Sequence, residues 1–198
     1  MRLTYQVVKN AVTSAGFKWF IGGIYNINLV GIRSKDLDSN NFNDFMCVAY
    51  CDGYNNILHT FPITTDPGIY YRENPCNVNG TAILAPGQHR GLWKIGKHKG
   101  KYPALVQNKE AKVYRDNDQD DQIDFNGEIE SGIFGINCHH ARYEGESRQV
   151  DKWSAGCQVF ANYDDHKLFM DLCARAAKNF GSVFSYTLLE EEKNFNMG

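Results

Sequence analysis

GINCHH (residues 135–140) and WSAGCQ (residues 153–158) lie on either side of a polar loop and bring together a histidine, a cysteine and glycines. A cysteine nucleophile needs a neighbouring base to take its proton and backbone donors to receive an oxyanion. A strand that carries His139, a loop that folds over the site and a tight turn at Gly156 and Cys157 would supply these groups. The two stretches therefore predict a cysteine-based active site.

The rest of the chain reads as short β-type runs separated by turn residues, with helical spacing near its two ends. Apolar residues at helical spacing predict a helix before Gly16 and another at Asp164–Lys178. The polar tail Glu190–Gly198 is expected to be frayed. Runs rich in β-branched and aromatic residues predict strands at Tyr25–Ile32, Phe42–Tyr50, Ile57–Ile63, Thr81–Leu84, Gly91–Ile95, Tyr102–Gln107, Lys112–Tyr114, Ser131–His139 and Ser182–Leu189.

These elements predict an α+β fold that is mainly β, with a short N-terminal helix and a second helix after Cys157. No repeat, low-complexity block or linker divides the chain, so residues 1–198 are expected to form a single domain. The motifs fall at about residues 60–160, and the helix and strands of residues 1–60 are either part of the same core or an accessory.

Composition excludes several classes of protein. The chain has 198 residues, of which 42% are hydrophobic, and its formal net charge is -2, so there is no global basic field to attract nucleic acid or anionic lipid. No apolar stretch reaches the roughly 20 residues of a membrane-spanning helix, and no signal peptide is recognised. Six cysteines without a CxxC pair are expected to be reduced thiols in a cytosolic setting.

His139, fourteen intervening residues and then Ser154-Ala155-Gly156-Cys157 resemble the signature of the L,D-transpeptidase (YkuD-type) family. That signature is a histidine, a spacer of this length and Ser/Thr-His-Gly-Cys followed by a polar residue. Residues 134–139 and 153–159 more closely resemble little-studied YkuD-like proteins of phages and Bacteroidetes-type bacteria. The resemblance implies a β-sheet or β-sandwich core.

The resemblance also implies an enzyme that acts on the stem peptides of peptidoglycan and needs no metal or organic cofactor. It makes Cys157 the nucleophile and His139 the base, with the imidazole oriented by the backbone carbonyl of His140. The backbone N–H groups of Gly156 and Cys157 would form the oxyanion hole, and Ser154 would shape the turn. His140 is the alternative base, but the spacing fits His139, and alternation along a strand points the side chain of His140 away from it.

Residues near the two motifs complete the expected site. Gln158 would hold either substrate or backbone, Arg142 and Lys152 in the loop would meet a stem carboxylate, and Trp153 would contact the substrate. Ala155 departs from the family, which has a second histidine there. This departure leaves open whether the acceptor is a second stem peptide or water, and whether the chain is a catalyst at all.

An acidic segment offers a looser candidate for calcium. Asp116, Asp118, Asp120 and Asp124 alternate as the ligands of a calcium loop do. However, Asp121 and Gly127 replace the glycine and glutamate that an EF-hand loop requires. A solvated acidic turn between strands is the favoured interpretation, and bound calcium is the alternative.

A basic run formed by Lys94, Lys97, His98, Lys99 and Lys101, with Trp93 and Tyr102, is expected to be the solvated face of a hairpin. A rim for an anionic substrate is the second interpretation of this run, and a nucleic-acid contact is the least favoured.

Two functional hypotheses follow from the sequence. The leading one is a cysteine enzyme that trims or cross-links peptidoglycan through an acyl-enzyme on Cys157. The alternative is a non-catalytic YkuD-like module that binds peptidoglycan or builds a structure such as a phage virion. In either case the protein would be made in the cytoplasm and act on the cell wall, delivered as a phage lysis or virion protein or by a secretion system. The sequence does not indicate an oligomeric state.

Overall fold

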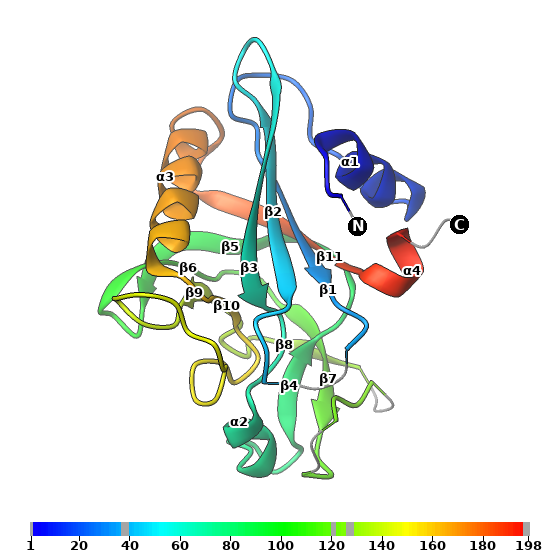
Figure 1. Cartoon of the computed structure of the whole chain (residues 1–198), viewed down its shortest axis with the longest axis vertical. Helices are drawn as coiled ribbons and strands as arrows, with labels where there is room; N and C mark the ends of the chain where they lie inside the picture. Colours follow the sequence, from blue (N-terminus) through cyan, green and yellow to red (C-terminus); the bar gives the residue numbers. More distant parts are fainter. Residues whose placement is uncertain (1, 37–39, 120–121, 126–128, 196–198) are drawn as a thin grey trace.

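The computed structural model describes residues 2–36, 40–119, 122–125 and 129–195, and Figure 1 shows their arrangement. Within these residues the chain forms α1 (Tyr5–Ser14), β1 (Asn28–Arg33), β2 (Asp44–Cys51), β3 (Asn56–Thr64), α2 (Ile69–Glu73), β4 (Thr81–Leu84), β5 (Gly87–His98), β6 (Tyr102–Gln107), β7 (Ala111–Asp116), β8 (Glu130–Gly132), β9 (Cys138–His140), β10 (Gln158–Phe160), α3 (Tyr163–Phe180), β11 (Val183–Glu190) and α4 (Glu191–Phe195).

Eight strands close into a barrel in the order β1-β11-β5-β6-β9-β10-β3-β2. The pairs β1–β11 and β9–β10 are parallel, and the other strand pairs of the barrel are antiparallel. A separate sheet of three strands, β4-β7-β8, lies at one end of the barrel beside α2 (Figure 1). The predicted mainly-β α+β class is confirmed, whereas this closed barrel does not confirm the sandwich that the resemblance implies.

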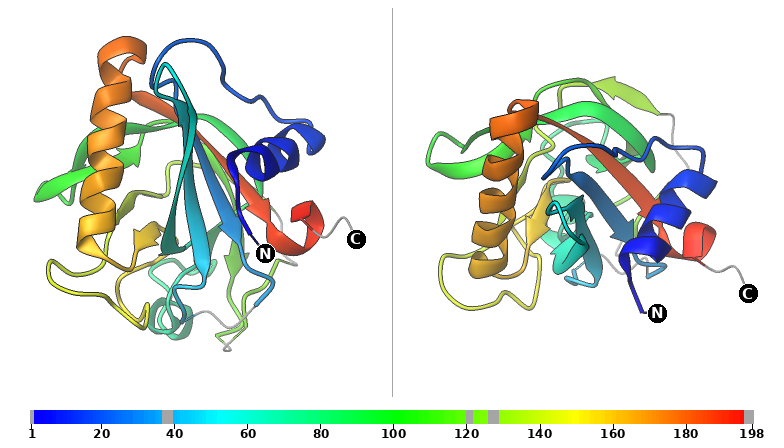
Figure 2. Two further views of the ribbon diagram at one scale, coloured as in Figure 1. Left: turned by 45° about the horizontal axis from the view of Figure 1, so that its top comes forward. Right: turned by 90° about the horizontal axis from the view of Figure 1, so that it is seen from above.

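The larger apolar core joins barrel side chains to the inner face of α3. Trp93 and Tyr186 lie at its centre with ring centroids 4.4 Å apart. α3 buries Phe169, Leu172 and Cys173 in the same core, and Figure 2 shows this helix lying along one side of the barrel. The helix packs against β6, β9 and β10, so it covers the strands that carry the histidine and cysteine motifs.

α3 begins one residue before and ends two residues after the predicted helix Asp164–Lys178, and local contacts set both ends. The side chain of Asn162 caps its first turn by accepting hydrogen bonds from the N–H groups of Asp164 and Asp165. Gly181, with a φ of 81°, ends the helix in a conformation that glycine adopts at little cost.

A second apolar core lies on the other side of the barrel. α1 packs Val8, Ala11 and Val12 against β1 and β2 residues that include Val30 and Cys47. Figure 2 shows α1 and α4 lying near each other on this side of the molecule. The strands β1, β2 and β3, all from the first 64 residues, are therefore part of the closed barrel.

The predicted strand Ser131–His139 is wrong, because only its two ends are strands. β8 and β9 are separated by a segment in which two N–H groups donate to a side chain instead of to a neighbouring strand. The Oε1 atom of Gln107 accepts from the N–H groups of Phe134 and Ile136, at 3.0 and 2.9 Å. Gly135, with a φ of 77°, then turns the chain into β9.

The predicted frayed tail is wrong for residues 191–195, which form α4. Asn194 accepts a hydrogen bond from the N–H of Glu190 at 2.9 Å, and Lys193 forms an ion pair with Glu190 at 2.7 Å. Phe195 packs against the second core, which gives the short helix an apolar anchor. The last three residues of the predicted tail lie outside the described residues.

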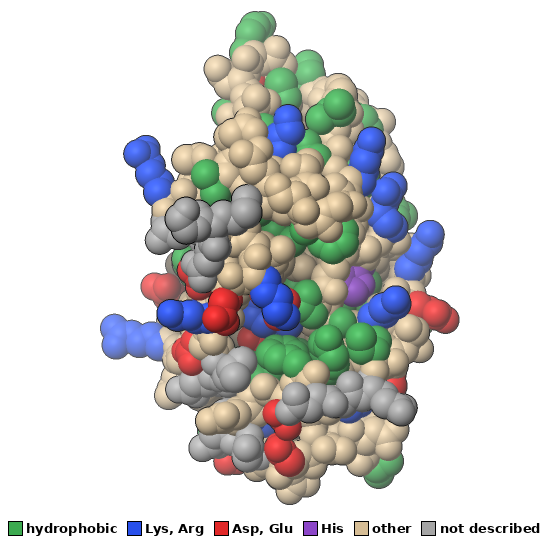
Figure 3. Space-filling model, turned by 90° about the vertical axis from the view of Figure 1, so that its right-hand side faces the viewer, with side chains coloured by type: hydrophobic (Ala, Val, Ile, Leu, Met, Phe, Trp, Pro, Cys, Tyr) green, Lys and Arg blue, Asp and Glu red, His purple; other side chains and the backbone are tan. Residues whose placement is uncertain are grey.

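Figure 3 shows one face of the molecule, on which Lys and Arg side chains are interspersed with Asp and Glu. This mixture agrees with the near-neutral net charge of -2. None of the helices in the described part of the chain is long and apolar enough to cross a membrane.

Gly31 in β1 gives a stability test of the barrel. A methyl group at this position would overlap the hydroxyl of Tyr186, which donates a hydrogen bond of 2.7 Å to Gln158 beside the candidate site. We expect Gly31→Ala to lower the free energy of unfolding by about 2–3 kcal/mol, as overpacking of a tight core does. Urea unfolding followed by fluorescence measures the change.

Gly100→Ala is the matched control, because Gly100 lies in a turn with a φ of 71° and open space around it. This change carries only the cost of a left-handed alanine, about 1 kcal/mol. Equal losses for the two variants would contradict the steric account of Gly31.

Candidate active site

The parallel pair β9–β10 brings the two sequence motifs side by side. His139 is in register with Val159, and the N–H of Gln158 donates to the carbonyl of Asn137 at 2.8 Å. Cys157 precedes Val159 by two residues, so alternation places the side chains of Cys157 and His139 on the same face of this pair. Strand spacing puts their Cα atoms roughly 8 Å apart, within reach of the two side chains.

Hydrogen bonding fixes the tautomer of His139. Its Nδ1 lies 2.9 Å from the backbone carbonyl oxygen of His140, and a carbonyl can only accept, so Nδ1 carries the proton. Burial lowers the pKa of His139 to about 3, an effect strengthened by His98 and opposed by the His140 carbonyl. The ring is therefore neutral at physiological pH, and Nε2 is left as a bare acceptor. This is the orientation that the resemblance implies for the base.

Two residues that sequence reasoning did not place in the site hold this ring. His98, at the end of β5, stacks on His139 with ring centroids 3.9 Å apart. The hydroxyl of Tyr102 lies 3.3 Å from Nδ1 of His139 and donates to the carbonyl of His140 at 3.4 Å. Both residues belong to the basic run, which was expected to be a solvated face. His98 and Trp93 are instead buried and form a wall. The pairing of β6 with β9 brings this wall to the site, and no local pattern encodes that pairing.

The chain reaches Cys157 through a turn that Ser154 closes. The hydroxyl of Ser154 accepts from the N–H of Gly156 at 3.1 Å and donates to the carbonyl of Cys157 at 2.9 Å. Gly156 has a φ of 110°, and a side chain there would collide with the carbonyl of Ala82 in β4. The turn-shaping role expected of Ser154 agrees with this geometry, and Gly156 is required by the close approach of β4.

One of the two N–H groups expected to form the oxyanion hole is engaged within the turn. The N–H of Gly156 turns inward to Ser154, because the left-handed conformation of Gly156 directs it there. No hydrogen-bond partner of the Cys157 N–H is found in the described part of the chain. One of the two expected donors therefore remains.

The thiol of Cys157 is neutral in this structure. It is half-buried and donates to the carbonyl of Gly135 at 3.4 Å. Burial raises the pKa of Cys157 to about 11, although the Asn137 backbone N–H and the nearby charge of Lys99 act to lower it. No hydrogen bond links Cys157 to His139 among the described residues, so the two groups do not form a thiolate–imidazolium pair.

Gln158 is a structural residue and not a substrate contact, which corrects one of its two expected roles. Its side chain is fully buried, donates to the carbonyl of Thr65 at 3.2 Å and accepts from the hydroxyl of Tyr186 at 2.7 Å. Asp44 accepts from both the N–H and the hydroxyl of Thr65, at 2.7 and 2.8 Å. These bonds hold β10 against β3 and the centre of the barrel.

The other expected substrate contacts lie on the loop between β9 and β10. Arg142 is exposed just after β9, and Trp153 is 40% exposed just before the Ser154 turn. The loop is tied down along its length: the N–H of Val150 donates to the carbonyl of Asn40 at 3.0 Å, and that of Gly68 donates to the carbonyl of Ser154 at 2.9 Å. His140 faces away from His139, as alternation predicts, and its ring packs against residues of α3 instead.

The favoured interpretation of the acidic segment, a solvated turn, is wrong at Asp116, which is fully buried in an ion pair with Arg72 at 3.0 Å. This carboxylate is engaged with a cation, so it is not available as a calcium ligand. Asp120 lies outside the described residues. Asp118 is exposed and Asp124 half-buried, and no group of three metal-ligating side chains occurs in the described part of the chain.

A cavity of about 440 Å³ opens at Ala155, two residues before Cys157. Its walls include Tyr71, Phe134 and Arg115, and Tyr71 lies close enough to Cys157 for the two to interact electrostatically. Arg115 forms an ion pair with Glu130 at 2.9 Å. The small side chain of Ala155, where the resembled family has a histidine, leaves space at this wall of the cavity.

No protein-family model matches the chain, and no curated protein matches it.

The buried histidine gives a pH test of stability. The unfolded chain protonates His139 near the ordinary pKa of 6.5, whereas the folded chain does so only near 3. The stabilisation is therefore complete above pH 6.5 and is lost as the pH falls toward 3. We expect the unfolding free energy of the wild type to fall relative to His139→Gln by about 1 kcal/mol per pH unit in this window.

Urea unfolding at several pH values measures this difference. The comparison with His139→Gln matters because burial raises the pKa of Asp44 to about 7, which acts in the opposite direction and is common to both proteins. Parallel curves for the two proteins would contradict a buried neutral His139.

Alkylation of Cys157 tests the state of the thiol. Because its pKa is about 11, the rate with iodoacetamide should rise roughly tenfold per pH unit up to that value and show no plateau near neutrality. Lys99→Gln should move the profile to higher pH, and His139→Gln should leave it unchanged. Peptide mass spectrometry separates Cys157 from the exposed Cys76. A plateau below pH 8 would instead indicate a preformed ion pair with His139.

Proposed function

We propose that the protein is a cysteine acyltransferase or peptidase that acts on peptidoglycan stem peptides through an acyl-enzyme on Cys157. The observation that carries the proposal is the hydrogen bond from Nδ1 of His139 to the carbonyl of His140. This bond leaves Nε2 as a base on the face of β9–β10 that also carries Cys157. The substrate class comes from the family resemblance, which the spacing of His139 and Cys157 supports.

In the proposed reaction the thiol leaves the Gly135 carbonyl, and its proton passes to Nε2 of His139 as the sulfur attacks a peptide carbonyl. A carbon–sulfur bond forms and the carbon–nitrogen bond of the peptide breaks. The leaving amine takes the proton back from the imidazolium. An amine or water then attacks the thioester carbonyl, and His139 removes a proton from this nucleophile. The carbon–sulfur bond breaks, and the imidazolium returns its proton to the sulfur, so the thiol of Cys157 and the neutral imidazole are restored.

The raised pKa of Cys157 favours proton transfer during attack instead of a thiolate formed in advance. A neutral thiol beside a neutral imidazole requires the base at the moment of attack, so turnover should depend on His139 even where alkylation does not. The N–H of Cys157 is the donor proposed to receive the developing negative charge. Lys99, which already acts on this thiol electrostatically, would add a positive field.

The cavity at Ala155 is the proposed place for the stem peptide. It adjoins the Ser154 turn, and Arg115 on its wall offers a guanidinium that a substrate carboxylate can share with Glu130. An Arg–carboxylate contact of this kind is directional, so it would orient the acyl donor toward Cys157.

The second candidate is a non-catalytic module that binds peptidoglycan. The engagement of the Gly156 N–H by Ser154 favours it, because an oxyanion would then meet fewer donors than the resembled family provides. Ala155 also favours the non-catalytic module, because the resembled family has a histidine at this position.

Muropeptide analysis decides between the two. We expect purified peptidoglycan incubated with the wild type to give new cross-links or trimmed stems, visible by mass spectrometry. Cys157→Ala and His139→Gln should each abolish these products, because one removes the nucleophile and the other the base. Cys51→Ala is the matched control, since Cys51 is a partly exposed cysteine at the end of β2 and does not line the Ala155 cavity.

Unchanged muropeptides with the wild type, together with sedimentation of both wild type and Cys157→Ala on insoluble peptidoglycan, would replace the enzyme by the binding module. Products that persist in Cys157→Ala would contradict the acyl-enzyme.

A further inference from the structure

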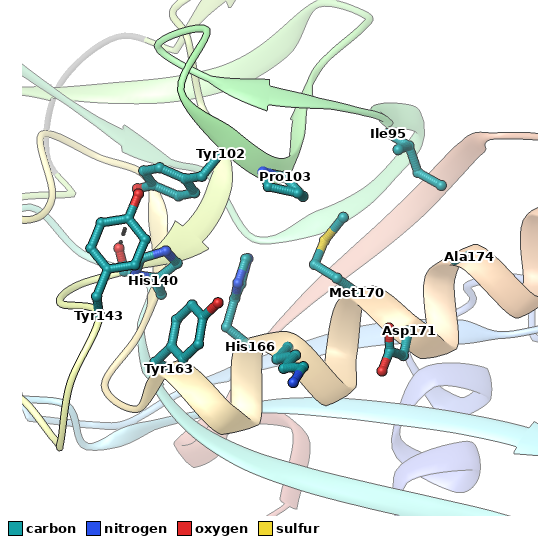
Figure 4. A pocket seen from close by; sticks show the side chains of 11 residues that line it. Ile95, Tyr102, Pro103, His140, Tyr143, Tyr163, His166, Met170, Asp171 and Ala174 are labelled. Carbon is teal, nitrogen blue, oxygen red and sulfur yellow. Dashed lines mark hydrogen bonds between the residues drawn. The ribbon is translucent and has the colours of Figure 1, made fainter.

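A second cavity of about 290 Å³ lies under α3, on the face of β9 opposite to His139. We call it the tyrosine–histidine cavity. Figure 4 shows Tyr102, His140 and Tyr143 gathered at one end, with Tyr163, His166 and Met170 rising from α3 beneath them. The ring centroids of His140 and His166 are 5.1 Å apart, and those of His140 and Tyr102 are 4.3 Å apart.

Two buried imidazoles in this cavity carry ring nitrogens without a partner. His166 is 3% exposed and His140 is 1% exposed, and Nε2 of His166 and both ring nitrogens of His140 lack a hydrogen bond within the described part of the chain. Figure 4 shows the ring of His166 pointing up from the helix into the space below Tyr102 and Pro103. Buried polar atoms in proteins are nearly always bonded to protein, water or ligand, so an unpartnered nitrogen that faces a cavity marks a position where a donor group can bind.

The chemistry of these nitrogens specifies a hydrogen-bond donor. The other ring nitrogen of His166 bonds the backbone of Cys138, and burial lowers the pKa of His166 to about 3. The imidazole is therefore neutral at physiological pH, with a lone pair on Nε2 that accepts from an N–H or O–H group.

The walls specify a flat and mostly apolar ligand without net charge. Aromatic rings and the side chains of Ile95, Pro103 and Met170 offer carbon surface, and Lys167 and Asp171 contribute opposite charges. A sugar ring, with several hydroxyl groups to satisfy, would leave most of them unpaired here. An apolar cavity of roughly 150 Å³ holds benzene, so 290 Å³ accepts a bicyclic ring.

We propose that the tyrosine–histidine cavity is a binding site for a neutral aromatic or heteroaromatic ring that bears an N–H or O–H donor, with His166 Nε2 as the acceptor. This site is separate from the cavity at Ala155 and does not depend on the proposed peptidoglycan chemistry. Its occupant would touch Tyr102 and His140, whose hydroxyl and carbonyl hold the ring of His139.

Two isomeric probes test the acceptor. 3-Methylindole keeps the ring N–H. Its isomer 1-methylindole carries the methyl group on the ring nitrogen and therefore has no N–H to donate. Calorimetric titration of the wild type should show saturable binding of 3-methylindole and binding of 1-methylindole that is weaker by roughly tenfold, the value of one buried hydrogen bond. His166→Phe keeps a ring but removes the acceptor, so it should bind the two isomers equally.

Two further variants separate binding from folding. Ala174→Trp fills the cavity from an exposed position on α3 and should abolish binding of both isomers. His59→Phe is a matched histidine change outside the cavity and should leave both affinities unchanged.

Absence of saturable binding to the wild type would overturn the proposal. Equal affinities of the two isomers for the wild type, or binding that survives Ala174→Trp, would also overturn it. If Zn²⁺ binds to the wild type but not to His166→Phe, and neither indole binds, the imidazoles of His140 and His166 form a metal site instead.

Discussion

The hydrogen bond from Nδ1 of His139 to the carbonyl of His140, 2.9 Å long, is the constraint on which the candidate site depends. Because the carbonyl can only accept, the bond places the single proton of a neutral imidazole on Nδ1 and leaves Nε2 bare. Burial keeps the ring neutral, and the stacked ring of His98 limits its rotation. The backbone of the next residue thus fixes the tautomer and the orientation of this imidazole.

The barrel maintains this arrangement from both sides. Parallel pairing of β9 with β10 sets the offset between His139 and Cys157, and Gln158 ties β10 to Thr65 and Tyr186. Because Tyr186 also fills the space over Gly31, the packing of β1 and the position of β10 are linked through one side chain. The same β9 strand presents His140 to the opposite face, where the tyrosine–histidine cavity lies. One strand therefore separates a thiol site from a second cavity.

Patterns of local sequence predicted the helices α1 and α3, the mainly-β class and the spacing that joins His139 to Cys157. They failed where a distant side chain replaces a local partner. Ser131–His139 reads as a buried strand, yet Gln107 accepts from the N–H groups of Phe134 and Ile136. The stacking of His98 on His139 and the loss of the Gly156 N–H to Ser154 follow from tertiary contacts and from a left-handed glycine. The raised pKa of Cys157 arises from burial, which the motif does not reveal.

The tautomer of His139 tests the account most directly. Long-range proton–nitrogen correlation spectra of the imidazole at neutral pH, assigned by the loss of its signals in His139→Gln, distinguish a protonated from a bare ring nitrogen. The account predicts a proton on Nδ1, a bare Nε2 and no change down to about pH 4, because burial holds the pKa of this ring near 3. A bare Nδ1, or an imidazolium with both nitrogens protonated at neutral pH, would contradict it.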